Sequence, residues 1–186
     1  MHFKQQNYRK TRWKNGQGVT SEIAIHPEGA SIADETFLWR LSTAEIAASG
    51  SFSVFRGYDR HLTVLSGEKL QLRFEKDLRE KWLAQGEVIQ FSGDEAVSCE
   101  IQAGVVTDLG LIYRRDLVKA EFKMIELNGP ASEQVMTSRQ ALIYVVSGNI
   151  SGIPAGVRPG DTWSVGPGKL ILQSSAGKVA LITLDW

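Results

Sequence analysis

The chain is a succession of short runs rich in β-branched and aromatic residues, and most of them end at Gly, Ser, Asn or Asp. Strands must bury one face and manage their exposed edges, so a chain built this way predicts an all-β sandwich or barrel. A helix is predicted only over residues 75–83, where Leu78 and Trp82 lie four positions apart. The predicted strands are 18–25, 37–46, 62–65, 69–74, 88–91, 97–101, 111–113, 118–127, 142–146, 162–165, 170–173 and 179–184.

Two of these runs end alike. Leu62-Thr-Val-Leu-Ser-Gly67 resembles Leu142-Ile-Tyr-Val-Val-Ser-Gly148, and each is followed by a Gly turn, a short strand and another Gly turn. This order is typical of a cupin, a double-stranded jelly-roll β-barrel, and it indicates an internal duplication. The alternative is that Ser-Gly after an apolar strand is ordinary turn chemistry.

Composition excludes several classes of protein. The 186 residues carry 21 Lys and Arg against 21 Asp and Glu, so the long-range attraction that nucleic acid or an anionic membrane requires is missing. No run approaches the roughly 18 apolar residues of a membrane span. The polar N-terminus lacks the apolar region of a signal peptide, and we therefore expect a cytoplasmic protein.

Metal and cofactor sites are not indicated. His2, His26 and His61 are scattered, so we expect no metal, and we expect no other cofactor. His61 is interpreted as a structural or rim residue. The single cysteine, Cys99, lies in a predicted strand with no histidine nearby and is interpreted as a small buried side chain.

Polar residues gather in the first third of the chain. The three segments are Trp13-Lys-Asn-Gly-Gln-Gly-Val-Thr-Ser-Glu22, Phe37-Leu-Trp-Arg-Leu-Ser-Thr-Ala44 and Gly50-Ser-Phe-Ser-Val-Phe-Arg-Gly-Tyr-Asp-Arg60. Strand alternation points Trp39 and Arg40 to opposite faces, and it separates Asp59 from Arg60 in the same way. An arginine inside a barrel needs a counter-charge or an anionic ligand, so these segments are candidates for a binding site.

These segments, together with Leu62–Gly67, resemble the HutD/Ves family in content and order, and the likeness extends from about residue 12 to the C-terminus. The resemblance implies a cupin fold of two germin-like halves, packed as one bicupin-like unit. We place the halves at 1–115 and 116–186. It also implies an accessory or regulatory role in bacterial histidine utilisation. One departure is Gly110, which follows Asp108-Leu where the family tends to have Asn, so any ligand contact from that Asn is absent.

The leading hypothesis is a metal-independent cupin that binds a small anionic metabolite in its N-terminal half. The resemblance makes urocanate, formiminoglutamate and formylglutamate the candidate ligands. The expected partner is this metabolite, with no nucleic acid and no membrane, and a homodimer stays open. The candidate ligand-binding residues combine cations, hydrogen-bonding groups and an apolar wall: Trp13, Lys14, Asn15, Thr20, Glu22, Arg40, Phe52, Ser53 and Arg60.

Two other functions are kept as alternatives. The chain could be a metal-free enzyme with Glu22 as its general base, which would require a raised pKa, whereas a neighbouring cation would lower it. Glu22 could instead simply pair with Lys14 or Arg40. The chain could also be an interaction module that offers an exposed sheet edge to a protein partner.

Overall fold

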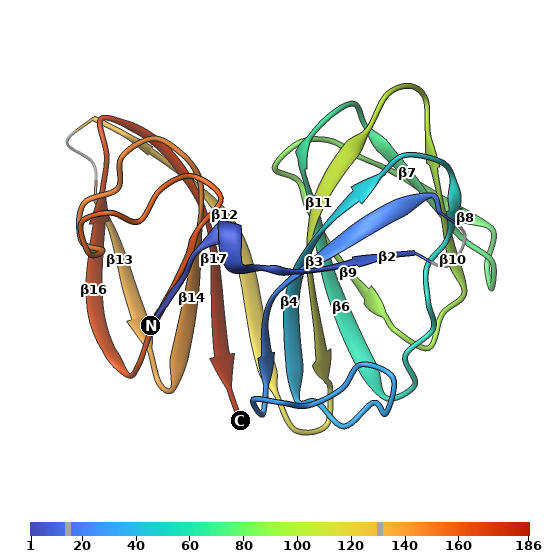
Figure 1. The fold of residues 1–186 in the computed structure, drawn as a ribbon, viewed down its shortest axis with the longest axis horizontal. Coiled ribbons are helices and arrows are strands. Elements are labelled where there is room, and N and C mark those ends of the chain that lie inside the picture. Colours follow the sequence, from blue (N-terminus) through green and yellow to red (C-terminus); the bar gives the residue numbers. More distant parts are fainter. Residues whose placement is uncertain (14–15, 130–131) are drawn as a thin grey trace. The chain divides into compact units, whose positions relative to one another are not determined.

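The computed structural model describes residues 1–13, 16–129 and 132–186, and these are mainly strands joined by turns and loops (Figure 1). The only helical segment among them is the 3-10 turn η1 (Gln5–Asn7), so the all-β prediction is confirmed. None of the described helical structure is long and apolar enough to cross a membrane. The chain forms two compact units: the N-terminal unit, Arg9–Leu117, and the C-terminal unit, Val118–Trp186 together with Met1–Tyr8.

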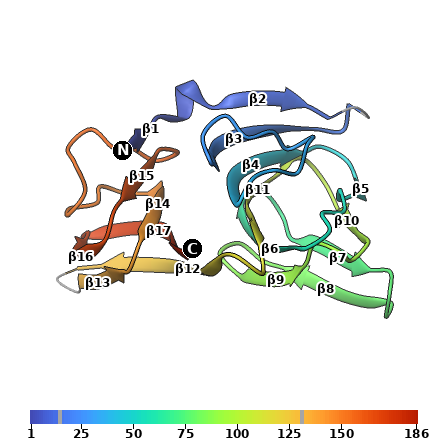
Figure 2. The ribbon, with the colours of Figure 1, turned by 90° about the horizontal axis from the view of Figure 1, so that it is seen from below.

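The N-terminal unit contains two antiparallel sheets, and Figure 2 shows that the larger one is strongly curved. The six-stranded sheet has the order β2 (Arg9–Arg12), β3 (Gly18–His26), β4 (Trp39–Ile46), β11 (Val106–Arg114), β6 (Tyr58–Ser66), β9 (Val88–Ser92). The four-stranded sheet has the order β5 (Gly50–Ser51), β10 (Val97–Ile101), β7 (Leu70–Phe74), β8 (Arg79–Leu83).

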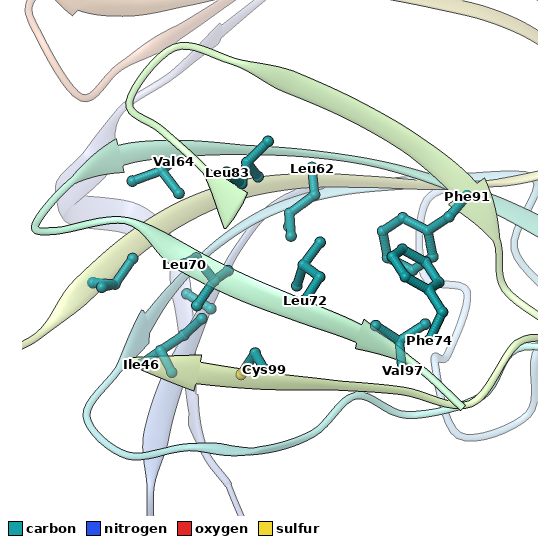
Figure 3. Packing of buried hydrophobic residues seen from close by; sticks show 12 residues of the cluster. Ile46, Leu62, Val64, Leu70, Leu72, Phe74, Leu83, Phe91, Val97 and Cys99 are labelled. Carbon is teal, nitrogen blue, oxygen red and sulfur yellow. The ribbon is translucent and has the colours of Figure 1, made fainter. Parts of the chain in front are cut away.

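A continuous apolar core joins the two sheets of this unit (Figure 3). Leu62 and Val64 of β6 enter it from the six-stranded sheet, and Leu72 and Phe74 of β7 enter it from the four-stranded sheet. Cys99 of β10 is buried in the same core, which confirms its interpretation as a packed side chain. Residues of the six-stranded sheet that alternate with Leu62 and Val64 face the other way, and the face that carries the core is called here the inner face.

The C-terminal unit repeats the arrangement with fewer strands. Its five-stranded sheet has the order β1 (His2–Phe3), β15 (Thr162–Val165), β14 (Gln140–Ser147), β17 (Ala176–Asp185), β12 (Lys119–Asn128), and its second sheet pairs β13 (Ser132–Thr137) with β16 (Gly168–Gln173). Its core is apolar and includes Ile143, Leu172 and Val179. The first eight residues belong to this unit because β1 pairs with β15 and the Tyr8 hydroxyl donates to the Gly160 carbonyl at 2.8 Å.

The two Ser-Gly segments have the same local geometry. Gly67 and Gly148 both have positive φ, at 94° and 79°. A Cβ on Gly67 would lie 2.5 Å from the carbonyl oxygen of Val105, and one on Gly148 would lie 2.2 Å from that of Ala176. Glycine adopts this backbone conformation without strain, and its missing side chain permits so close an approach. The likeness predicted from the sequence therefore extends to the backbone.

The predicted helix over 75–83 is wrong. Residues 75–78 form a turn between β7 and β8. The two strands form a hairpin in which Arg73 of β7 is paired with Glu80 of β8. Leu78 is 79% exposed and Trp82 is 40% exposed, so their spacing does not produce a packed apolar face. A pattern of two apolar residues is too short to distinguish a helix from a hairpin.

Candidate functional site

Charged side chains interrupt the inner face of the six-stranded sheet next to the apolar core. Arg40 and Ser42 of β4 lie on this face because they are four and two residues before the core residue Ala44, and every second residue of a strand shares a face. Arg60 of β6 and Asp108 of β11 lie on it by the same alternation, and Glu22 of β3 is opposite Ser42. These five residues are called here the inner polar cluster.

Arg40 is matched by a carboxylate. Its Nε donates to Glu22 Oε2 at 2.7 Å, and its Nη1 lies 3.4 Å from the Ser42 hydroxyl. Glu22 Oε1 lies 3.0 Å from Nη2 of Arg9, which is largely exposed. Both carboxylate oxygens of Glu22 are thus held by arginines. This arrangement suits a positioning role better than that of a general base, which needs an oxygen within reach of a substrate proton.

Arg60 is deeply buried but has few polar partners. It is 9% exposed, and its guanidinium lies over the ring of Phe52, with Cζ 4.7 Å from the ring centroid, and 5.4 Å from that of Phe91. Within the described chain its only hydrogen bond is from Nη1 to the Ser53 carbonyl at 3.2 Å, and no carboxylate lies within 4.0 Å. Burial lowers the pKa of Arg60 to about 10, and the group remains charged at neutral pH.

Asp108 is the other weakly matched charge. It is 4% exposed, and its Oδ1 accepts a hydrogen bond from the Ala44 amide at 3.1 Å. Burial raises the pKa of Asp108 to about 7, although the Arg60 charge and the Ala44 hydrogen bond act in the opposite direction. No other donor from the described residues reaches this carboxylate.

The remaining candidates lie around this cluster. The Trp13 indole donates to the Thr20 hydroxyl at 2.8 Å, and Trp13 packs against the apolar core. The Phe52 ring lies under the Arg60 guanidinium and packs against the apolar core. Ser53 is exposed, and its backbone carbonyl accepts a hydrogen bond from Arg60. Lys14 and Asn15 lie outside the described residues.

The other histidines and arginines serve different purposes. His61 faces away from Arg60 and stacks on Tyr113 with ring centroids 5.5 Å apart, and burial lowers its pKa to about 4. Asp59 likewise leaves the inner face and pairs with Arg115 at 3.1 Å, so the predicted separation of Asp59 from Arg60 is confirmed. In the described part of the chain, no three His, Cys, Asp or Glu side chains are grouped so that they could hold a metal ion.

A surface hollow elsewhere on the N-terminal unit is a weaker candidate. It has a volume of about 560 Å³ and is lined in part by Ser92, Asp94, Glu95 and Arg115. Arg115 already binds Asp94 and Asp59, so its charge is satisfied by the protein. The inner polar cluster, in contrast, leaves Arg60 and Asp108 with incomplete contacts.

Comparison with known proteins decides the family. The HutD family model matches residues 5–174 of this chain. The chain belongs to the HutD family. A 21.2 kDa protein from the hutC 3' region of Pseudomonas putida is 32% identical over 151 residues, which cover 81% of this chain and 76% of that protein. Protein Ves of Citrobacter koseri is 29% identical over 177 residues, covering 94% and 88%.

Solved structures extend the likeness to the fold. HutD from Pseudomonas fluorescens SBW25 superposes with a TM-score of 0.83 at 26% identity, covering all of this chain and 99% of that one. A cupin 2 conserved barrel domain protein from Leptotrichia buccalis gives a TM-score of 0.59 at 12% identity, over 94% and 92% of the two chains. The fold of this HutD-family chain is therefore cupin-like.

Sequence reasoning did not place Asp108, Ser42 or Phe91 in the site of this HutD-family chain. Asp108 had a usable signal, because a lone carboxylate within an otherwise apolar strand is rare unless it is paired or functional. Phe91 looks like any core residue in sequence. Its contact with Arg60 exists because β9 pairs with β6, where the two residues are opposite each other.

Proposed function

We propose that the N-terminal unit binds a small anionic metabolite at the inner polar cluster, without a metal. The ligand's carboxylate would meet Arg60 and Arg40, while Phe52 and Trp13 provide apolar surface. Fixed polar groups within an apolar lining are the usual composition of a small-molecule site. The candidate ligands are urocanate, formiminoglutamate and formylglutamate.

The observation that carries the proposal is the incomplete matching of Arg60. A guanidinium has five N–H donors. The Arg60 guanidinium is buried, and among the described residues it donates one hydrogen bond, to the Ser53 carbonyl, and has no carboxylate within 4.0 Å. Burying a charge without full compensation is unfavourable unless a ligand supplies the missing partners. Planar, forked donors of this kind suit a carboxylate.

The charge balance of the cluster also supports an anion. Arg40 and Arg60 of the cluster, together with the largely exposed Arg9 beside it, face two carboxylates among the described residues, Glu22 and Asp108. Because the pKa of Asp108 is raised to about 7, part of the population carries no negative charge there at neutral pH. The cluster therefore has a positive excess, which an anionic ligand would neutralise.

The role in the cell is proposed from the names of relatives. The family name HutD and the relative from the hutC 3' region of Pseudomonas putida support an accessory or regulatory role in histidine utilisation. We further propose that each unit is one germin-like half of a bicupin. The shared geometry at Gly67 and Gly148 supports a duplication.

Isothermal titration calorimetry with the three candidate ligands tests the proposal. Arg60→Met should weaken binding about 100-fold, because two charge-assisted hydrogen bonds are lost. Since this variant removes a buried charge and keeps an apolar side chain of similar length, we expect it to remain folded.

The matched control is Arg79→Met. Arg79 also lies over an aromatic ring, with Cζ 4.0 Å from the Phe74 centroid, but it is half exposed and pairs with Asp77 and Glu95. The Arg79→Met variant should bind the ligand with the same affinity as the parent protein. Absence of heat with all three compounds at millimolar concentration, or equal losses in both variants, would contradict the proposal.

A further inference from the structure

The centre of the inner polar cluster is occupied by a residue without a side chain. Gly110 lies in β11 with Ser42 of β4 on one side and Leu62 of β6 on the other. It is partly exposed, although its strand is paired on both edges. Its neighbours Leu109 and Leu111 face the opposite side and are 0% exposed, so the exposure of Gly110 comes from the inner face.

A side-chain carbon would fit above Gly110 without a clash. Beyond its chain neighbours, the described residues that a Cβ at this position would meet are Leu62, with Cδ1 at 3.5 Å, and His61, with its carbonyl oxygen at 3.9 Å, both ordinary van der Waals distances. No atom from the four-stranded sheet lies within 4 Å of that point. Among the described residues, the inner face therefore has room beside Gly110 for at least one further carbon atom, and this room is called here the hollow at Gly110.

Opposite kinds of hydrogen-bonding groups border this hollow. On one side, the Arg40 guanidinium extends along β4 toward the Ser42 hydroxyl. Ser42 is paired with Gly110, so the guanidinium lies beside Gly110. On the other side lies Asp108, two residues before Gly110 on the same face. The Ala44 amide occupies Asp108 Oδ1, and Oδ2 has no donor from the residues that the structure describes.

We infer that the ligand spans the hollow at Gly110, with its carboxylate on the arginines and an N–H or O–H donor on Asp108. The inference rests on the proposed function, and it narrows the ligand class from small anions to carboxylic acids that also carry a hydrogen-bond donor. Asp108 then acts as a specificity-determining residue, and Gly110 supplies the room that a larger side chain would fill.

The physical reason is the unfavourable state of Asp108 in the absence of a ligand. A buried carboxylate with a single donor has lost most of its hydration without replacement, and a ligand donor restores part of it. An acid of the same shape without the donor leaves Oδ2 unmatched and should be rejected. Sites built around such a group discriminate strongly against analogues that lack the matching atom.

A pair of acids of similar shape tests the inference at pH 8, where Asp108 is ionised. Urocanate and trans-cinnamate share the acrylate group, but the imidazole N–H of urocanate has no equivalent in the phenyl ring of cinnamate. Calorimetry should show urocanate binding about 10- to 100-fold more tightly, the value of one hydrogen bond to a charged group. Equal affinities would overturn the inference and leave the anion site standing. If neither acid binds, the anion site and the inference both fail for this ligand class.

Two variants separate the contributions of Asp108 and Gly110. Asp108→Asn keeps the acceptor for the Ala44 amide but presents an NH₂ group in place of Oδ2, so the preference for urocanate over cinnamate should disappear. The loss of the Asp108 charge acts on both acids alike, and the ratio of their affinities is therefore the quantity to compare. Gly110→Ala should fit the ligand-free protein but occupy the hollow, and it should weaken urocanate about tenfold or more.

The control for the second variant is Gly166→Ala, because a Cβ added to Gly166 would meet no atom within 4 Å and this glycine lies in the C-terminal unit. It should leave binding unchanged. Melting temperatures of all variants report whether the fold is kept. A retained preference for urocanate in Asp108→Asn, or an unchanged urocanate affinity in Gly110→Ala, with the fold kept, would overturn the inference.

Discussion

The two units place different residues at equivalent positions of their inner faces. Counting back from the Ser-Gly ends of β6 and β14, Arg60 corresponds to Ala141, which is fully buried in an apolar core. Asp108 is opposite Val64, and the corresponding position opposite Val145 is Val179. One unit thus completes its core with apolar side chains, while the other keeps charges there. The N-terminal unit therefore lacks apolar packing at the positions of the proposed ligand site.

The sheets also differ at the edge beyond these positions. In the N-terminal unit, β4 continues into β3 and β2, and β3 contributes Glu22. Across the described C-terminal unit, the corresponding sheet ends at β12, where Glu121 and Lys123 form an ion pair that is 68% and 63% exposed. Two extra strands therefore convert an exposed pair of charges into a covered one.

A second contrast concerns the buried aspartates. Asp161 in the C-terminal unit accepts hydrogen bonds from the Gln5 amide at 2.8 Å and the Arg158 amide at 3.1 Å, and lies 2.9 Å from His2 Nε2. Burial raises the pKa of Asp161, but these donors outweigh it and the net shift is downward. Asp108 has one donor and a raised pKa. Asp161, with three hydrogen-bonding neighbours, holds the N-terminal segment in place, whereas Asp108 keeps an oxygen without a donor from the described residues.

Exchanging the inner-face residues should give the largest effect. Ala141→Arg introduces a guanidinium without a counter-charge into a packed core and should destabilise the protein by more than about 4 kcal/mol. Arg60→Met makes the opposite change and should leave the free energy of unfolding equal or higher. Urea denaturation followed by tryptophan fluorescence measures both. A tolerated Ala141→Arg would show that the two inner faces are less different than the structure indicates.

The pH dependence of Asp108 should be nearly as large. Its pKa rises from 3.8 in the unfolded chain to about 7 in the folded protein, where Arg60, Cys99 and the Ala44 amide surround it. The folded state therefore holds this proton more tightly, and stability is lost as the pH rises from about 4 through 7, by about 4 kcal/mol at most.

Asp108→Asn does not titrate, so its stability relative to the parent protein should grow over that pH interval and level off above pH 8. Urea midpoints measured from pH 4 to 8 for both proteins provide the comparison. An advantage that stays constant with pH would contradict the raised pKa.

Asp161 should behave in the opposite sense. Asp161→Asn should lower the free energy of unfolding at pH 7 by about 3 kcal/mol, since the amide cannot accept from both backbone amides and His2. Because the folded pKa lies below 3.8, this stabilisation is lost as the pH falls through that range, and the two proteins should converge in acid. Hydrogen exchange at Gln5 would show whether the N-terminal segment is released.

The smallest effect should come from the exposed pair on β12. Lys123→Ala removes a surface ion pair and should change stability by less than about 0.5 kcal/mol. Glu22→Gln, at the covered counterpart, weakens the contacts to Arg40 and Arg9 and should cost about 2 kcal/mol. Similar values for the two variants would remove the contrast between the open edge and the covered one.

Part of the candidate site was predictable from sequence. Strand alternation predicted that Arg40 and Trp39 lie on opposite faces of the sheet, and that Arg60 and Asp59 do so as well. The structure confirms both predictions. The same reasoning failed for Asp108, because its importance depends on Arg60 and Ala44, which reach it from two other strands. The helix predicted over residues 75–83 was wrong because a spacing of four between two apolar residues occurs in hairpins as well as in helices.

Short-range features of this protein follow from its amino-acid sequence: most of its strands, the glycine-dependent ends of β6 and β14, and the faces on which Arg40 and Arg60 lie. These depend on backbone geometry within a few residues. Which arginine receives a carboxylate was decided by the tertiary structure, since Arg40 meets Glu22 while Arg60 meets aromatic rings and a carbonyl. Electrostatic matching depends on distances between strands that are remote in the chain, and alternation within one strand carries no information about those distances.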